Sequence, residues 1–269
     1  MRFIYSNAER VIELFKELNI NFEYRSFGII PSSKKRGGYI ILEKLQQYIQ
    51  SVKTETELID FLKTDRFFRI ILRKRDKDFQ LKSRYLVLAT GGYAGKFEIT
   101  DNTCYNKCNI FEIVKKNNGE IINLDCILTH PFGYDTGKKI LIGNDSKKGE
   151  FIDSEGNPVF DKKLRQLIKN DDYHESFNLL LKQIEDCRKK GFKVYFIDAN
   201  KKIEITPTVH YTAGGIKANY EGEVIGCKNL FVIGECRADG SKNGGRLPGY
   251  SFTSSIVNAK YLAERISGG

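Results

Sequence analysis

The sequence contains no tryptophan, one methionine, five prolines and three histidines in 269 residues. It has no apolar run that approaches the ~18 residues of a membrane-spanning helix, and its first residues do not have the pattern of a secretory leader. Residues 7–18 instead predict an amphipathic helix, with Ser6 as its cap. We therefore expect a globular, cytoplasmic chain without a transmembrane segment, large enough for one domain or two smaller ones.

A second absence concerns nucleotide binding. The fingerprint Gly-x-Gly-x-x-Gly, which holds a dinucleotide pyrophosphate where a strand runs into a helix, does not occur among the 24 glycines. Two glycine-bearing segments of the kind that surrounds a nucleotide are nevertheless present, RYLVLATGGYAG at 84–95 and the stretch 208–252. The sequence predicts part of a nucleotide site without its phosphate-binding unit.

The charge is positive but scattered. Forty-four Lys and Arg against 34 Asp and Glu give +10, a balance that attracts polyanions. The two basic clusters, 34–36 and 73–77, are not interleaved with aromatic residues, as a nucleic-acid groove requires. We interpret both clusters as solvated surface and expect no nucleic-acid partner.

The six cysteines are predicted to be reduced thiols, because a cytoplasmic chain does not rely on a disulfide framework. Cys104 and Cys108 form a CxxxC pair. One pair supplies too few thiolates for a structural zinc or iron–sulfur site, and no third Cys or His stands nearby. We therefore expect no metal site.

The order of apolar runs predicts an α/β fold. A more polar stretch, 133–202, interrupts the alternation and predicts an inserted α+β lobe between two segments of one larger domain. The expected boundaries are 1–131 and 207–269 for the larger domain and 132–206 for the inserted one. Helices are expected at 7–18, 39–52, 109–117, 173–190 and 251–266, and strands at 67–72, 85–88, 120–128, 193–198 and 229–233.

The strand at 229–233 ends at Gly234 and Glu235, a step with a physical logic for a nucleotide cofactor. Glycine lets the backbone approach a ligand, and a carboxylate accepts hydrogen bonds from sugar or ribityl hydroxyls. On the local sequence alone, an ordinary turn followed by a surface acid is an equal alternative.

The next loop strengthens the first interpretation. Arg246 follows two glycines, and Pro248 and Gly249 lead into Ser251 and the last predicted helix. A cation and the free NH groups of a helix N-terminus then face the same place, which favours an anion such as a carboxylate or the pyrimidine edge of a reduced flavin. The alternative is a salt-bridged surface arginine beside an ordinary cap.

With these residues in place, the chain resembles the succinate dehydrogenase, fumarate reductase and L-aspartate oxidase flavoproteins. Five elements occur in that family's order. They are ATGG at Ala89 to Gly92, HP at His130 and Pro131, HYTAGGI at His210 to Ile216, GE at Gly234 and Glu235, and GGRLPGYS at Gly244 to Ser251.

The resemblance implies an incomplete Rossmann-like FAD-binding domain with a mobile capping domain. It makes Glu235 a ligand of the FAD ribityl chain and places the helix start near Ser251 and Phe252 at the flavin pyrimidine edge. Thr90 and Gly91 would lie near the nucleotide half of the cofactor. His210 and Arg246 match residues that bind a substrate carboxylate, and His130 matches a third polar residue there.

The sequence also departs from the family. Ile142 and Gly143 take the place of a Thr-Glu pair in the capping lobe, and the family's proton-transferring arginine is replaced by Tyr173 and His174. His174 is interpreted either as an acid or base or as a solvated residue of an acidic loop. The loop PGYSFTSS also differs from the sequence usual in the family. The substrate is therefore left open.

The resemblance implies a FAD-dependent oxidoreductase subunit or fragment that moves hydride between flavin and a small carboxylate-bearing substrate. The absence of the βαβ unit that would open such a protein has three explanations: a partner chain supplies the unit, the chain is a fragment, or FAD is no longer needed. Met1 and the helical start favour a subunit. We expect noncovalent FAD binding to be weak or absent in the isolated chain. A noncatalytic paralogue serving in binding or assembly is the alternative.

Overall fold

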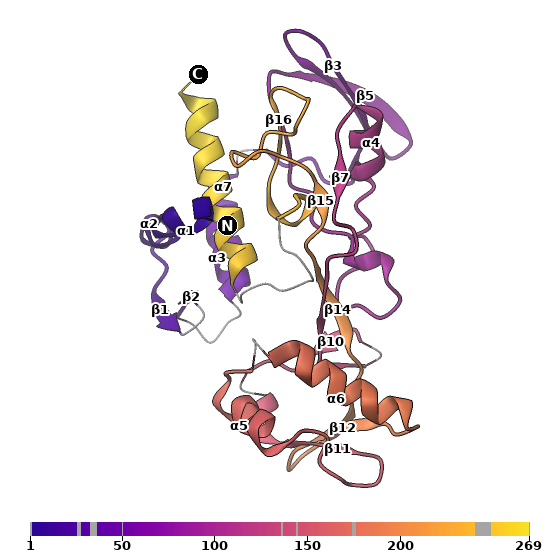
Figure 1. Cartoon of the computed structure of the whole chain (residues 1–269). Coiled ribbons are helices and arrows are strands. Elements are labelled where there is room, and N and C mark those ends of the chain that lie inside the picture. The colour runs from indigo at the N-terminus through magenta and orange to yellow at the C-terminus, as the bar shows by residue number, and fades with distance from the viewer. Residues whose placement is uncertain are drawn as a thin grey trace.

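The computed structural model describes residues 2–25, 28–32, 37–49, 51–135, 137–143, 145–173, 176–239 and 249–268. Figure 1 shows a larger assembly that contains both ends of the chain and a smaller one built from residues of the middle, joined by an extended connection that includes a pair of short strands. The larger assembly combines the N-terminal helices, two strands of a parallel sheet, an antiparallel three-stranded sheet and the C-terminal helix.

The N-terminal segment packs against the last helix. Val11, Phe15 and Ile41 share a buried cluster with Ile256, which comes from the other end of the chain. Ser6 ends the first helix and Ala8 is the N-cap of the second, so the expected Ser6 cap is wrong. The elements are α1 (Arg2–Ser6), α2 (Glu9–Glu17), β1 (Phe22–Arg25), β2 (Gly28–Pro31), α3 (Gly37–Leu45), η1 (Gln46–Tyr48) and α7 (Tyr250–Ser267).

An antiparallel meander follows, of which the sequence predicted only the middle strand. Its strands are β3 (Thr56–Lys63), β4 (Phe68–Lys74) and β5 (Lys77–Ser83). Arg75 and Asp76 form the tight turn between the last two, both with positive φ, as a hairpin turn of this length requires. The basic cluster at 73–77 is therefore a hairpin tip, and Arg73 there pairs with Asp78 at 2.7 Å.

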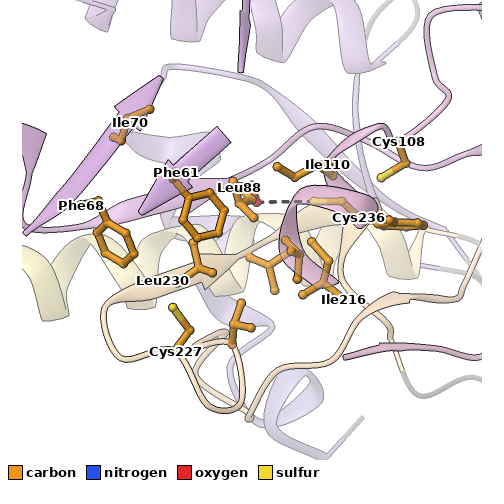
Figure 2. Packing of buried hydrophobic residues seen from close by; sticks show 14 of the residues in the cluster. Phe61, Phe68, Ile70, Leu88, Cys108, Ile110, Ile216, Cys227, Leu230 and Cys236 are labelled. Carbon is orange, nitrogen blue, oxygen red and sulfur yellow. Dashed lines mark hydrogen bonds between the residues drawn. The ribbon is translucent and has the colours of Figure 1, made fainter. Parts of the chain in front are cut away.

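A parallel pair forms the centre of the larger assembly. β6 (Leu86–Leu88) lies beside β16 (Leu230–Val232), although more than 140 residues separate them in the sequence. Figure 2 shows Leu88, Leu230 and Cys236 packed with Phe61 and Phe68 of the meander. Burial of these apolar side chains stabilises the junction. The helix predicted at 109–117 is confirmed as α4 (Ile110–Lys116), and its buried residues belong to the same cluster.

The single strand predicted at 120–128 is wrong. The chain forms β7 (Ile121–Ile122), turns at Asn123 with φ 57°, and continues as β8 (Ile127–His130). The two strands pair separately with β15 (Gly215–Ile216) and β14 (Thr208–Thr212). The turn lets one apolar run serve two successive pairings.

The smaller assembly has its own apolar cluster, whose buried members run from Phe132 to Ile205. The helix at 162–170 was not predicted; it begins where the Asp161 carboxylate accepts a hydrogen bond from Leu164 N at 2.9 Å. The predicted long helix and strand are confirmed as α6 and β12. The elements are β9 (Gly133–Tyr134), β10 (Lys139–Ile140), η3 (Ser146–Lys148), β11 (Glu150–Asp153), α5 (Lys162–Asn170), α6 (Phe177–Lys189), β12 (Val194–Ile197) and β13 (Lys202–Glu204).

Two further findings concern the cysteines and the possible membrane-spanning or metal-binding elements. All six cysteines are free thiols. Within the described ranges, no helix is both long and apolar enough to cross a membrane, and no cluster of three or more His, Cys, Asp or Glu is placed to hold a metal ion.

Candidate functional site

The two parallel strands end side by side at glycines. Gly91 follows β6 with φ 75°, and Gly234 follows β16 with φ 71°, a left-handed conformation that residues with a Cβ rarely adopt. Both glycines line one cavity of about 570 Å³ between the strand ends, the N-terminal helices and α7. This volume lies in the range of cofactor and ligand pockets.

The cavity wall is mostly apolar, with few polar groups. α2 contributes Leu14, α3 contributes Ile41 and Leu45, and α7 contributes Phe252, Ile256 and Ala259. Glu235 is the only carboxylate among the described lining residues. It belongs to η5 (Gly234–Cys236), the short turn after β16.

Glu235 is held by a strand from the other side of the site. The backbone N–H and the hydroxyl of Thr212 both donate to its Oε1, at 2.9 and 3.0 Å. Tyr93 N in turn donates to the Thr212 hydroxyl at 3.2 Å. A Cβ at Gly92 would collide with the Glu235 carboxylate and the Thr212 hydroxyl. The second glycine of ATGG thus makes room for this contact.

The last helix presents its first turn to the same region. Gly249 precedes it with φ 75° in a left-handed cap. The Ser251 carbonyl accepts hydrogen bonds from the hydroxyls of Ser254 and Ser255, at 3.0 and 2.7 Å. The Phe252 ring lines the cavity, and its centroid lies 6.1 Å from the centroid of the Phe15 ring. The structure therefore brings Phe252 to the cavity with Gly91 and Glu235.

Two buried thiols lie beneath the ATGG loop. Cys108 donates to the Gly91 carbonyl, and Cys236 donates to the Leu88 carbonyl, each at 3.5 Å. Burial raises the pKa of Cys108 to about 12, so this thiol stays protonated at neutral pH. Thr90, an exposed residue, contributes hydrogen bonds at both thiols. The thiols therefore support the loop as neutral groups.

His210 lies on β14 at an irregularity in strand pairing. Val209 pairs with Thr129 and Tyr211 with Leu128, so His210 is the extra residue of a bulge, a feature that redirects side chains beside binding sites. Its Nδ1 lies 2.8 Å from Oδ2 of Asp101. The imidazole is partly exposed (39%) and the carboxylate mostly buried (14%).

His130, at the end of β8, pairs with Thr208 in the sheet, and its ring contacts that of His210. The two rings lie edge to face with centroids 5.7 Å apart, and His130 also contacts the Phe177 ring of α6 at 4.9 Å. His130 is 4% exposed, and its Nδ1 accepts a hydrogen bond from Phe132 N at 3.1 Å. The structure thus brings together two of the three predicted substrate-binding residues.

The third, Arg246, lies outside the described residues, as does His174. Tyr173 is described and is fully buried among Phe132 and Phe177 of the smaller assembly. Burial raises the pKa of its phenol. Tyr173 is therefore a core residue.

Sequence reasoning missed Asp101 and Thr212. Thr212 belongs to the HYTAGGI motif, so its place two residues after His210 on a strand was a usable signal. Asp101 had no such signal. Asp101 is the residue after Thr100. The Thr100 hydroxyl donates to the Val209 carbonyl and so holds the segment after ATGG against β14.

The comparisons with known proteins agree with this geometry. The family model described as FAD binding domain matches residues 150–252. The L-aspartate oxidase of Clostridium acetobutylicum is 24% identical over 262 residues, covering 87% of this chain and 57% of that protein. The L-aspartate oxidase of Saccharolobus solfataricus is 28% identical over 215 residues, covering 71% of this chain and 44% of that protein.

Solved structures show the same fold. An E. coli quinol fumarate reductase variant superposes with a TM-score of 0.78 at 16% identity, over 99% of this chain and 56% of that one. An open flavocytochrome c3 fumarate reductase superposes with a TM-score of 0.71 at 15% identity, over 99% and 63%. The chain spans about half the length of the curated relatives it matches.

The chain thus shares the fold of the fumarate reductase structures, and part of it matches the family model of a FAD binding domain. The predicted resemblance to the succinate dehydrogenase, fumarate reductase and L-aspartate oxidase flavoproteins is confirmed. The match to the FAD binding domain and the flavoprotein relatives support FAD as the cofactor.

Proposed function

We propose that the chain forms the substrate-facing part of a FAD-dependent oxidoreductase acting on a small carboxylate-bearing substrate. The observation that carries this proposal is the Glu235 carboxylate, held by Thr212 at a cavity of about 570 Å³ where two parallel strands end. The residues fit a flavin nucleotide, because Gly91 and Gly234 keep the strand ends free of side chains and the wall is apolar.

In this proposal each part of the site has one task. Glu235 would accept hydrogen bonds from the ribityl chain, Thr90 and Gly91 would lie near the nucleotide half, and the first turn of α7, at Ser251 and Phe252, would support the pyrimidine edge. Bound FAD supplies hydride transfer at its N5 atom. His130, His210 and Arg246 bind and orient the substrate carboxylate.

The sheet edge supports the accompanying proposal of a supplied βαβ unit. β6 pairs with β16 through the Leu86 amide and the Leu88 carbonyl. In the described ranges no strand lies along its other edge, where Val87 is 38% exposed. An apolar, unpaired edge is a ready template for one more strand. We propose that the strand of a dinucleotide-binding unit adds there, from a partner chain or from a segment outside this chain.

The domain division stays part of the proposal. Residues 132–206 would cap the site, with 1–131 and 207–269 as the cofactor-binding body. The separate apolar cluster from Phe132 to Ile205 supports this division, and the Phe177 contact with His130 supports a position of the capping domain next to the proposed substrate residues.

Flavin titration tests the cofactor site. We expect the chain alone to bind FAD weakly or not at all, and a yellow complex when a βαβ unit from a related flavoprotein is co-expressed. Glu235→Ala should lower the flavin content of that complex, and Glu98→Ala, at an exposed residue, should not. Stoichiometric FAD on the chain alone would contradict the incomplete site.

The same experiment decides the alternative, a noncatalytic paralogue. The absence of Gly-x-Gly-x-x-Gly from the chain is the observation that favours it. A stable complex that forms with the supplied unit but carries no flavin would support this second function.

Substrate binding is tested with the reconstituted complex. Arg246→Ala should weaken carboxylate binding, and Tyr173→Phe should leave it nearly unchanged because that phenol is buried in the cap. We expect slow turnover of succinate, fumarate and aspartate, since a missing proton donor usually costs ~10²–10⁴-fold in rate. Rapid turnover would show that the proton donor lies elsewhere.

A further inference from the structure

Asp101 belongs to a segment fastened to the strand that carries His210. The Thr100 hydroxyl donates to the Val209 carbonyl at 2.8 Å, and Val209 N donates to the Ile99 carbonyl at 3.0 Å. Asn102 Nδ2 donates to the His210 carbonyl at 2.9 Å. These contacts fix the Asp101 carboxylate relative to the imidazole independently of the Asp101–His210 contact itself.

The Asp101 contact determines where the proton of His210 resides. A carboxylate only accepts hydrogen bonds, so Nδ1 of His210, at 2.8 Å from Oδ2, carries a proton. In the neutral ring Nε2 then holds the lone pair. Nε2 points away from Asp101 across the ring and is the nitrogen left for a ligand.

His130 is held in the opposite tautomer. Its Nδ1 accepts the Phe132 N–H at 3.1 Å, so Nδ1 carries a lone pair and Nε2 carries the proton. Two imidazoles with centroids 5.7 Å apart therefore present opposite hydrogen-bonding roles at Nε2, a donor on His130 and an acceptor on neutral His210.

We propose that Asp101 is a positioning residue that makes His210 the proton-handling group of the site, so that a carboxylate ligand binds at His210 together with one proton. This inference rests on the proposed function. A carboxylate oxygen requires a donor. His210 offers one only after Nε2 takes a proton from solvent, and Asp101 then balances the charge of the imidazolium. In the described part of the chain, the titratable groups that contact His210 are Asp101 and His130.

Asp101→Asn changes the tautomer in a defined way. Oδ1 of Asp101 accepts from Asn102 Nδ2 at 3.2 Å, so the new amide keeps its oxygen on that side and turns its NH₂ group toward His210. Nδ1 of His210 must then accept, and the proton moves to Nε2. The altered ring is a donor without proton uptake.

The deciding measurement is long-range ¹⁵N–¹H NMR of the full chain, whose three histidines are assigned with single His→Gln variants. At a pH where the rings are neutral, we expect Nδ1–H for His210 and Nε2–H for His130. Asp101→Asn should convert His210 alone, and the exposed Asp65→Asn should convert neither. Nε2–H on wild-type His210 would overturn the proposal, and this readout needs no flavin.

The coupling between succinate binding and proton uptake is tested by calorimetry. Succinate is titrated into the reconstituted complex in buffers of different ionisation enthalpy. Wild type should take up about one proton per succinate and Asp101→Asn about none. Equal uptake by the two proteins, or no succinate binding by wild type, would overturn the coupling. If the complex with the supplied βαβ unit carries no flavin while the tautomers are as expected, the proposed function is contradicted and the assigned tautomers stand.

Discussion

The Thr212 amide and hydroxyl both donate to Oε1 of Glu235, at 2.9 and 3.0 Å, and so join β14 to the turn after β16. His210 lies on the same strand as Thr212, two residues earlier. The carboxylate proposed to contact the cofactor and the predicted substrate histidine are therefore both linked to β14.

Thr212→Val should destabilise the fold. The substitution keeps the shape of a fully buried side chain but removes the hydroxyl that donates to Glu235 and accepts from Tyr93 N. Leaving buried partners unsatisfied costs about 1–3 kcal/mol in the free energy of unfolding. Urea unfolding measures it, with Thr212→Ser as the control that keeps the hydroxyl. Equal midpoints for Val and wild type would count against the contact.

Gly92→Ala should also destabilise, because the added Cβ meets the Glu235 carboxylate and the Thr212 hydroxyl. Overpacking of this kind costs about 1–3 kcal/mol. Gly38→Ala is the matched control. A Cβ at Gly38 meets nothing within 4 Å, and its helical position predicts a gain of about 0.5–1 kcal/mol. In thermal unfolding, the midpoint should fall for Gly92→Ala and rise for Gly38→Ala. Midpoints that shift in the same direction would refute the steric argument.

Asp161, the N-cap residue of α5, should make the stability of the smaller assembly sensitive to acid. The hydrogen bond from Leu164 N, followed by that from Gln183, lowers the pKa of Asp161. A lowered folded pKa means that the carboxylate stabilises above the unfolded value of about 3.9 and loses that effect as pH falls through the folded pKa. Asp161→Ala should cost about 1 kcal/mol at pH 7, and the difference from wild type should narrow below about pH 3.9. Asp161→Asn, which keeps an acceptor, is the control. A difference that is constant with pH would exclude the ionised cap as its cause.

The proposed cap should move about residues 130–133 and 203–207. These two connections touch, since Thr206 N donates to the Gly133 carbonyl at 2.7 Å, so the hinge is a bending two-stranded ribbon. We expect amides in both connections to exchange with deuterium faster than those of β6 and β16. Protection equal to that of the central strands would speak against a hinge.

The sequence by itself determined the elements with strong local signals. The helices at 109–117, 173–190 and 251–266 and the strands before ATGG and GE appear within a few residues of their expected bounds, because apolar periodicity and glycine act over short distances. The same motifs indicated the resemblance to the flavoproteins and predicted Glu235, His130 and His210 as site residues.

Only the tertiary structure decided which of these residues meet. β6 pairs with β16 across more than 140 residues, Asp101 reaches His210 across 109, and Tyr93 reaches Thr212 across 119. No local pattern encodes such contacts, since they depend on how separate segments pack. The bulge at His210 and the opposite tautomers proposed for the two histidines likewise depend on strand register and hydrogen-bond partners, which exist only once the chain has folded.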